Sequence, residues 1–434
     1  MKPPKSRKAN PAPNAVEARK SRAEAAESAE FKMTELGPIP VDWEVCEIGD
    51  IACVCTGNSN TQDKVATGMY PFYVRSPIVE RINEYEFDTE GVITVGDGVG
   101  TGKVFHYVNG KFALHQRCYL IDRFCSNVDV KYFFKIFSAL FYDRVMQMTA
   151  KSSVDSVRRE MITGMPIPLP PLAEQRRIAG ALSDIDELIS ALGKLIEKKR
   201  NIKTGAMQEL LGMRNGECGM RNVPRRRLPG FSGEWVEKRL GECGSFSKGA
   251  GISRAQANSG RIPAVRYGEL YTTHHEYIKA FESFISDDVA RCSTRLTRGD
   301  IVFACSGETK EEIGKCAAFL GDEIAYAGGD LLILSPKEAY DSKFLAFELN
   351  TPFCASQKAA AGQGDAVVHI RQHSLEELIV CIPPTLAEQK AIAAVLSDMD
   401  AEIAALEADR AKYESIKQGM MQELLTGRTR LKGE

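Results

Sequence analysis

The chain contains one segment twice. Residues 172–211 and residues 386–425 align without a gap at an offset of 214, and about half of the aligned positions are identical. A second pair of similar segments, 39–54 and 228–246, precedes these copies, and each of its members contains a tryptophan. An internal repeat of this length indicates one structural unit present twice. Each unit therefore begins with a tryptophan segment and ends with the longer repeated segment.

The repeated segments are predicted to be long helices. Their apolar residues recur at alternating spacings of four and three, which is a heptad stripe. Prolines precede both segments and a glycine follows each, as is typical of helix ends. A helix of forty residues is about 60 Å long, too long for the core of a compact domain. The stripes consist of Ile178, Leu182, Ile185, Ile189, Leu192 and Ile196 in one helix and Ile392, Leu396, Met399, Ile403 and Leu406 in the other.

Two packing arrangements suit these stripes. We expect the helices to bury their stripes against each other as an antiparallel coiled coil, which relates the two repeats by a pseudo-two-fold axis. The alternative is two separate amphipathic helices, each packed on its own domain.

The segments between the helices are of the α+β class in their order of elements. Both contain short strands and turns followed by a helical stretch, with a shared Gly-Lys pair but little other identity. The predicted organisation is a disordered basic tail (1–34), a first domain (35–168), a first long helix (169–214), a linker (215–227), a second domain (228–380), a second long helix (381–428) and a short tail (429–434).

Composition excludes several classes of protein. A charged fraction of 26% with a net charge of −2 argues against a polyanion binder that acts by bulk charge, so any nucleic-acid site must be a local basic surface. The 12 cysteines form no C-x-x-C pair, which favours reduced thiols in a cytoplasm and no metal site. No stretch approaches the length of a membrane span, and we expect a cytosolic protein with no membrane contact.

The layout resembles the specificity subunit of type I restriction-modification systems. The resemblance covers almost everything after residue 30 and rests on three features: the segment Thr34-Glu35-Leu36-Gly37-Pro38-Ile39-Pro40-Val41-Asp42-Trp43, the segment Leu228-Pro229-Gly230-Phe231-Ser232-Gly233-Glu234-Trp235, and the two helices that begin with Ala-Glu-Gln and end with Met-Gln-Glu-Leu-Leu. The chain departs from the pattern in its basic N-terminal tail and at Asp409 and Arg410, which stand where the first helix has Leu195 and Ile196.

The resemblance implies a bipartite DNA reader. Each variable domain is then a target recognition domain for one half of a split sequence in double-stranded DNA. The two long helices separate these domains and serve as the platform on which two methylase subunits dock. Restriction subunits that translocate DNA are further expected partners. The chain itself is expected to carry no cofactor, while S-adenosylmethionine, ATP and Mg are expected on the partner subunits.

The residues favour reading over catalysis. An adenine methyltransferase needs an Asn/Asp-Pro-Pro-aromatic loop to hold the flipped base, and no such loop is present. The segment 96–104 is rich in glycine but does not match a phosphate loop, because Asp97 stands where that loop needs Gly and Val104 stands where it needs Ser or Thr. A strand is also predicted after the segment, where a phosphate loop requires a helix. We interpret it as a hairpin turn.

Base reading requires Arg, Lys, Asn or Gln side chains in the major groove, while Lys, Arg, Ser and Thr hold the phosphates. Polar clusters on predicted loops supply the candidates, and a minority of them is expected to contact DNA. The candidates are Lys103, His115, Gln116, Arg117, Lys151, Ser152, Ser153, Arg158 and Arg159 in the first domain and Lys248, Arg254, Arg261, Arg266, Lys310, Lys358, Gln363, His369, Arg371, Gln372 and His373 in the second.

Two other functions remain open at this point. A cytosolic scaffold would use the coiled coil and both domains to bind protein partners, and it would show no salt-dependent affinity for duplex DNA. An enzyme with its own methylase or nuclease activity would need the catalytic motifs that the sequence lacks.

Overall fold

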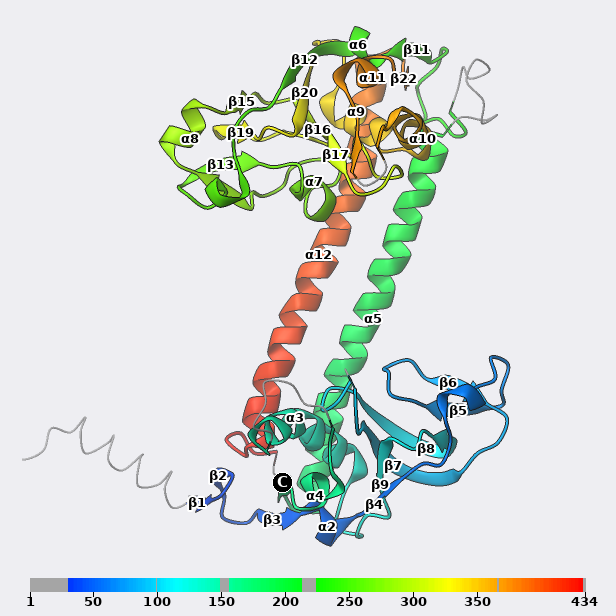
Figure 1. Ribbon diagram of the computed structural model, residues 1–434, viewed down its shortest axis with the longest axis vertical. Coiled ribbons are helices and arrows are strands. Elements are labelled where there is room, and N and C mark those ends of the chain that lie inside the picture. Colours follow the sequence, from blue (N-terminus) through cyan, green and yellow to red (C-terminus); the bar gives the residue numbers. More distant parts are fainter. Residues whose placement is uncertain (1–29, 99, 149–155, 213–223, 365–366, 432–434) are drawn as a thin grey trace, which may run out of the picture. The chain divides into compact units, whose positions relative to one another are not determined.

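The chain folds into two units. The computed structural model describes residues 30–98, 100–148, 156–212, 224–364 and 367–431. Residues 1–192 and 409–434 form the first unit, and residues 193–408 form the second. Each unit contains one α+β domain and parts of both long helices, α5 (Leu172–Leu210) and α12 (Leu386–Leu425) (Figure 1). The α+β class and the internal repeat predicted from the sequence are confirmed.

The domain of the first unit is built on a six-stranded sheet with the order β4-β9-β7-β8-β5-β6. Its strands pair antiparallel, except that β5 and β8 are parallel. The elements are β1 (Phe31–Thr34), β2 (Gly37–Pro40), β3 (Glu44–Glu47), α2 (Ile48–Ile51), β4 (Cys53–Thr56), β5 (Tyr70–Tyr73), β6 (Glu80–Ile82), β7 (Phe87–Val95), β8 (Phe105–Leu114), β9 (Cys118–Asp122), α3 (Val130–Met148), α4 (Arg159–Thr163) and β10 (Pro166–Leu169), with a 3-10 turn at Thr61–Asp63.

The domain of the second unit contains two four-stranded sheets, with the orders β12-β20-β16-β18 and β14-β13-β19-β15. Its elements are β11 (Val236–Arg239), α6 (Leu240–Cys243), β12 (Gly244–Lys248), β13 (Ile262–Val265), α7 (Glu269–Thr272), β14 (Ser283–Ile285), α8 (Asp287–Arg291), β15 (Thr294–Leu296), β16 (Ile301–Ala304), β17 (Ser306–Gly307), β18 (Cys316–Ala318), β19 (Ala325–Ala327), β20 (Leu331–Pro336), α9 (Ser342–Leu349), α10 (Pro352–Ala361), β21 (Val368–His369), α11 (Gln372–Glu376) and β22 (Ile379–Ile382), with a 3-10 turn at Arg254–Gln256.

The two domains share one topology despite their different sheets. The order β4-β9-β7-β8 in the first domain corresponds to β12-β20-β16-β18 in the second. The first domain then continues along the long strand β8 to β5 and β6. In the second domain the corresponding strand is interrupted between β18 and β19, and β19 pairs with β13 and β13 with β14. The common plan predicted from the sequence therefore extends to strand order.

Helix α3 covers one face of the first sheet. Its phenylalanines recur at a spacing of four, which places them on one side of the helix. Phe133, Phe137 and Phe141 are fully buried, and neighbouring rings along this row lie 5.4 and 4.5 Å apart. Phe105 of β8 meets Phe137 edge to face at 5.6 Å. This aromatic row fixes the helix on the sheet.

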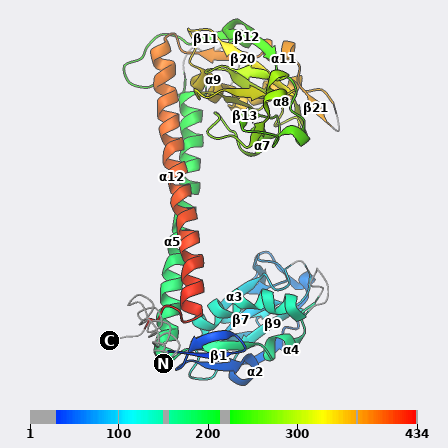
Figure 2. The ribbon, with the colours of Figure 1, turned by 90° about the vertical axis from the view of Figure 1, so that its left-hand side faces the viewer.

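The long helices run antiparallel within each unit. In the first unit, Glu174 at the start of α5 pairs with Arg430 just beyond α12. In the second unit, Lys203 near the end of α5 pairs with Asp400 near the start of α12, at 2.7 Å. The beginning of one helix thus lies beside the end of the other in both units, as both views show (Figures 1 and 2).

The heptad stripes join the domain cores. Ile178 and Leu182 of α5 belong to the core of the first domain, together with Leu424 and Leu425 of α12. The second core repeats this arrangement with Ile392 and Leu396 of α12 and Leu210 and Leu211 of α5. The predicted antiparallel pairing is therefore confirmed over the alternative of two separate helices, and each helix start packs on a domain as well as on the end of the other helix.

A charged pair of the helices is tied to the first domain. Asp186 of α5 forms a salt bridge with Lys417 of α12 at 2.6 Å and another with Lys135 of α3. Burial opposes the ionisation of Asp186, but hydrogen bonds from both lysines outweigh it and lower its pKa. This acid therefore stands between two cations.

The equivalent pair occurs in the second unit, but there the domain residue that binds it has the opposite charge. Asp400 and Lys203 lie at the repeat offset from Asp186 and Lys417. Here the domain contributes a carboxylate, since Lys203 also pairs with Glu276 at 2.8 Å. Burial, reinforced by the nearby Glu276, raises the pKa of Asp400 although Lys203 bonds to it. A cation therefore stands between two acids.

The element boundaries differ slightly from those predicted. The disordered tail was predicted to reach residue 34, but Phe31–Thr34 pairs with Gly37–Pro40; residues 1–29 lie outside the described residues. Both helices start later than predicted, because Pro166–Leu169 and Ile379–Ile382 are strands, and they end earlier, at Leu210 and Leu425. The end of the predicted linker and the start of the predicted C-terminal tail are anchored, because Arg227 and Arg430 bind buried carboxylates.

The charged residues at 409 and 410 do not enter a core. Arg410 is exposed and pairs with Glu414 one helical turn later, at 3.0 Å. The disturbance of helix packing that the sequence led us to expect there is avoided by turning this side chain to solvent.

We predict that Leu182→Ala lowers the free energy of unfolding of the first unit by about 3 kcal/mol, because it leaves a cavity in a closed core. The chain has two tryptophans, one in each unit, so urea denaturation of a Trp235→Phe background followed by Trp43 fluorescence reports the first unit. Leu188→Ala on the same helix, at a side chain that is 39% exposed, is the control and should cost less than about 1 kcal/mol. Equal losses would contradict the described core.

Candidate nucleic-acid interface

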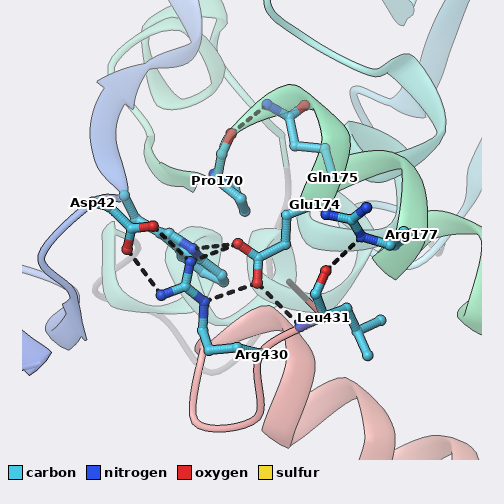
Figure 3. Close-up of polar contacts among 8 residues, drawn as sticks. Asp42, Pro170, Glu174, Gln175, Arg177, Arg430 and Leu431 are labelled. Atoms are coloured by element: carbon cyan, nitrogen blue, oxygen red, sulfur yellow. Dashed lines mark hydrogen bonds and ion pairs between the residues drawn. The ribbon is translucent and has the colours of Figure 1, made fainter. Parts of the chain in front are cut away.

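A buried carboxylate stands at the start of each long helix. In the first unit, the indole N–H of Trp43 donates to Oε2 of Glu174 at 3.2 Å. Arg430 donates to both oxygens of Glu174, from Nε at 2.8 Å and from Nη2 at 2.7 Å, and also binds Asp42 in a bidentate manner (Figure 3). The backbone N–H of Leu431 adds a further bond to Glu174. The glutamate of the Ala-Glu-Gln motif thus holds the tryptophan segment and the chain end together.

The second unit repeats this cluster. Trp235 donates to Glu388 at 3.3 Å, and Arg227 donates to both oxygens of Glu388 at 2.8 and 2.6 Å. Arg227 follows α5 and Arg430 follows α12, so each arginine comes after the helix opposite to its glutamate. We call these the anchor clusters: Trp43, Glu174 and Arg430 in the first unit, and Trp235, Glu388 and Arg227 in the second.

The glutamine of the same motif binds the domain. Gln175 accepts from the backbone N–H of Asp129 just before α3, and its amide group donates to the Asn127 carbonyl. The same amide group also donates to the Pro170 carbonyl (Figure 3). Gln389 likewise accepts from the N–H of Asp341, the N-cap of α9. One amide side chain in each unit therefore fixes the helix of the domain relative to the long helix.

Gly427 allows the chain to return to the anchor cluster. It follows α12 with a φ of +72°, in the left-handed region that favours glycine. A Cβ atom there would lie 2.5 Å from Pro40 and 3.1 Å from Trp43. The glycine predicted to end the second helix is confirmed, and it brings Arg430 back to Glu174.

Four backbone segments meet at one end of the first sheet. They are the stretches after β4, β5 and β7 and the turn between β8 and β9, and we call them the first loop edge: residues 57–60, 74–75, 96–97 and 115–117. The N–H of Gln116 donates to Ser59 at 2.9 Å, that of His115 to Tyr73 at 2.9 Å, and that of Gly96 to Arg117 at 2.9 Å. These bonds join all four segments into one frame.

The second domain has an equivalent frame, the second loop edge: residues 249–252, 266–267, 305–306 and 328–330. Gly329 donates to Gly251 at 2.9 Å, Gly328 to Val265 at 2.9 Å, and Cys305 to Asp330 at 3.0 Å. The backbone bonds match those of the first edge one for one. The side chains differ, since His115, Gln116 and Arg117 correspond to Gly328, Gly329 and Asp330.

Side chains fill the first loop edge. Asp97 binds Arg75 through Oδ1 at 3.2 Å and Arg117 through Oδ2. Burial opposes the ionisation of Asp97, but hydrogen bonds from Arg117 and Arg75 outweigh it and lower its pKa. His115 is buried and accepts the N–H of Arg117 at its Nδ1, 3.0 Å away. Burial, together with the nearby Arg75 and Arg117, lowers the pKa of His115 and favours the neutral ring.

The second loop edge is hollow. Glycines replace His115 and Gln116, and a cavity of about 820 Å³ lies over them. Arg254, Asn258, Arg266 and Tyr267 are among the residues that line it. The two domains thus present the same frame with different polar surfaces, as expected of two readers of different targets.

The structure separates the predicted site residues into three groups. His115 and Lys358 are buried, and the ammonium group of Lys358 donates to the Gly314 carbonyl at 2.8 Å, so neither side chain lies on the protein surface. Lys151, Ser152 and Ser153 lie outside the described residues. The others are exposed or half-buried: Lys103, Gln116, Arg117, Arg158, Arg159, Lys248, Arg254, Arg261, Arg266, Lys310, Gln363, His369, Arg371, Gln372 and His373.

The loop edges bring some of these candidates together. Gln116 and Arg117 belong to the first edge, and Arg254 and Arg266 line the cavity of the second. Sequence reasoning missed Arg75 and Asp97, which stand in separate loops more than twenty residues apart. Nothing in local composition links them, although the glycine-rich turn that contains Asp97 was recognised.

The described residues form neither a metal-binding cluster nor a membrane-spanning helix. No three His, Cys, Asp or Glu side chains gather there in a way that would hold a metal ion. None of the described helices is both long and apolar enough to cross a membrane.

Comparison with known proteins identifies the family. The family model for the type I restriction modification DNA specificity domain matches residues 40–201 and again residues 232–418. The chain belongs to this family and contains two copies of its domain. The match supports the DNA-reading interpretation over the scaffold alternative.

The similar proteins agree with this assignment. The putative type I restriction enzyme MjaX specificity subunit of Methanocaldococcus jannaschii is 28% identical and covers 93% of this chain and 97% of its own length. The type I restriction enzyme MjaVIII specificity subunit of the same organism is 26% identical, with coverages of 91% and 94%.

Solved structures share the fold. The S subunit of a type I restriction-modification system from M. genitalium matches with a TM-score of 0.60 at 14% identity, covering 91% of this chain and 98% of that one. A chain from a study of complex assembly and conformational transition in the type I R-M system gives a TM-score of 0.53 at 14% identity, with coverages of 90% and 99%.

We predict that Glu174→Gln destabilises the first unit by about 3 kcal/mol, because the change leaves the Arg430 guanidinium without its buried counter-charge. The pKa of Glu174 is lowered: burial opposes ionisation, but hydrogen bonds from Arg430 and Trp43 outweigh it. Its contribution is therefore present above the ordinary glutamate pKa of about 4.3 and is lost as the pH falls through the lower folded value.

Urea denaturation of the Trp235→Phe background between pH 7 and pH 3 measures this contribution. The difference between the parent and the Glu174→Gln variant should shrink as the pH falls. Arg410→Met removes an exposed pair on α12 and should cost less than about 1 kcal/mol at every pH. A constant difference over the whole range would contradict an ionised Glu174.

Proposed function

We propose that this chain is the DNA-reading specificity subunit of a type I restriction-modification complex and that each domain reads one half of a bipartite duplex sequence. The observation that carries the proposal is the pair of loop edges, which have the same backbone frame and different polar side chains. A reader of two unlike half-sites needs this combination, because base identity is read by side chains whose positions the backbone must fix.

The exposed side chains of the edges suit contact with base pairs. Arg117 and Gln116 are exposed on the first edge, and Arg254 and Asn258 are exposed in the lining of the cavity over the second edge. Arginine forms bidentate hydrogen bonds with guanine, and glutamine and asparagine do so with adenine. The predicted phosphate-binding role falls to the lysines around them, such as Lys103 and Lys248.

We further propose that the chain is not catalytic and acts with partner subunits. The sequence lacks the loop with which adenine methyltransferases hold a flipped base, so methyl transfer requires a separate methylase that binds S-adenosylmethionine. The repeat offers two equivalent places on the paired helices, which suits two methylase copies. A restriction subunit that uses ATP and Mg completes the proposed complex.

An exchange of one domain tests the division of labour. Residues 44–169 are replaced by the matching segment of a relative, and methylated adenines are mapped in cells that also express the methylase. We expect one half of the recognised sequence to change and the other half to stay, because each domain has its own core. Replacing residues 236–382 should change the other half. A change in both halves after either exchange would show that the domains do not read independently.

A methyl-transfer assay tests the non-catalytic role. The purified chain, incubated with duplex DNA and labelled S-adenosylmethionine, should transfer no methyl group, and addition of the purified methylase should start the reaction. Duplex DNA that lacks the target sequence is the control. Transfer by the chain alone would overturn this part of the proposal.

A further inference from the structure

The first loop edge contains a charge arrangement that the second lacks. Asp97 stands between Arg75 and Arg117 and uses one oxygen for each. The side chain of Asp97 is 15% exposed, whereas those of Arg75 and Arg117 are 45% and 61% exposed. The acid is therefore covered, and the two guanidinium groups reach the surface over it.

The arrangement is held from below. A Cβ atom on Gly96 would lie 2.7 Å from the Arg117 carbonyl, so only a glycine permits the bond between these two residues. The N–H of Val157 donates to Gly96 at 2.6 Å, and the neutral ring of His115 accepts the N–H of Arg117. Asp97 and Arg117 thus project from a backbone with little freedom to move.

The arginines keep most of their donors. Each guanidinium has five N–H groups, and each bonds to Asp97 through Nη1. Within the described residues, neither guanidinium group has a hydrogen-bonded or ion-paired partner other than Asp97. Donors remain on both sides of the acid for a ligand with paired acceptors.

An ionised carboxylate between two arginines discriminates between DNA groups. A phosphate would be attracted by the arginines but repelled by Asp97, and a flexible lysine or arginine without an acid serves that purpose better. A guanine edge is uncharged and presents O6 and N7 side by side, which matches an oriented guanidinium fork. The arrangement therefore suits a base edge more than the backbone of DNA.

We propose that Arg117 reads a guanine in the half-site of the first domain, with Arg75 beside it, and that Asp97 is the positioning residue that orients both guanidinium groups. The proposal rests on the proposed function, since it assigns one base contact to a domain that reads DNA. Asp97 touches no base and acts through the arginines.

The second domain provides the internal comparison. Its matching backbone bonds place Ser306 where Asp97 stands, Asp330 where Arg117 stands and Tyr267 where Arg75 stands. The oriented arginine pair is absent from this place, and a cavity lies there instead. A guanine read in this way belongs to the first half-site alone.

Three variants test the proposal in cells that express the full chain with its partner subunits, with methylated sites mapped across the genome. Arg117→Lys keeps the charge and loses the fork, so discrimination at one G·C pair of the first half-site should fall about tenfold. Asp97→Asn should relax the same position, and Asp97→Glu should restore part of the preference. The second half-site should stay unchanged in all three.

The outcomes are distinguishable. Asp322→Asn, which removes an exposed Arg–Asp pair of the second domain, is the control and should leave the motif as it is. If Arg117→Lys retains the motif and full methylation, Arg117 does not read a base and the proposal is overturned. A fourth variant, Arg117→Ala, overturns it as well if methylation falls equally at every site and the motif does not change. If Asp97→Asn fails to fold, which the Trp43 fluorescence of the Trp235→Phe background detects, Arg117→Lys still decides.

Failure of the proposed function has another signature. The parent chain with its partners would then produce no bipartite methylated motif at all. A parent motif whose first half contains no G·C pair at any position would leave the proposed function intact and overturn the guanine contact.

Discussion

A carboxylate removed from water at the start of each long helix constrains the whole architecture. Burying an ionised group costs several kcal/mol unless its oxygens are fully bonded, and Glu174 and Glu388 receive their bonds from a tryptophan before the domain and an arginine after the opposite helix. Neither cluster can form from one repeat alone. Each unit therefore draws together the beginning of its domain, the start of one helix and the end of the other, and the chain closes on itself through Arg430.

The anchor clusters leave the loop edges free to differ. Backbone bonds such as Gln116 to Ser59 and Gly329 to Gly251 maintain the same frame in both domains. The frame therefore does not depend on which side chains stand at these positions. Asp97 and two arginines occupy the first edge, and a cavity lies over the second. A backbone frame that both domains share, with different side chains on it, lets one fold read unlike targets, because sequence is read by side chains and not by the frame.

Much of the fold was predictable, because repeats and heptads are visible in sequence. The Ala-Glu-Gln helices, their antiparallel pairing and the glycine after the second helix are confirmed. The residues of the candidate site were harder to predict from the sequence, since burial and pairing between distant residues determine which side chains lie on the surface. Lys358 and His115 have the residue types of DNA contacts but face the interior. Arg75 and Asp97 looked unrelated, because a salt bridge between separate loops has no local pattern.

The charged pair on the long helices can be completed by a domain residue of either charge. Asp186 with Lys417 and Asp400 with Lys203 are the same pair, yet the first domain adds a lysine to it and the second adds Glu276. A domain can bind either the aspartate or the lysine of the pair. The pKa of the aspartate is lowered in the first unit, where the domain binds the aspartate, and raised in the second, where it binds the lysine. A pair that accepts either sign places no fixed charge requirement on the domain. Domains of different sequence can therefore be held on the same helices while their loop edges diverge.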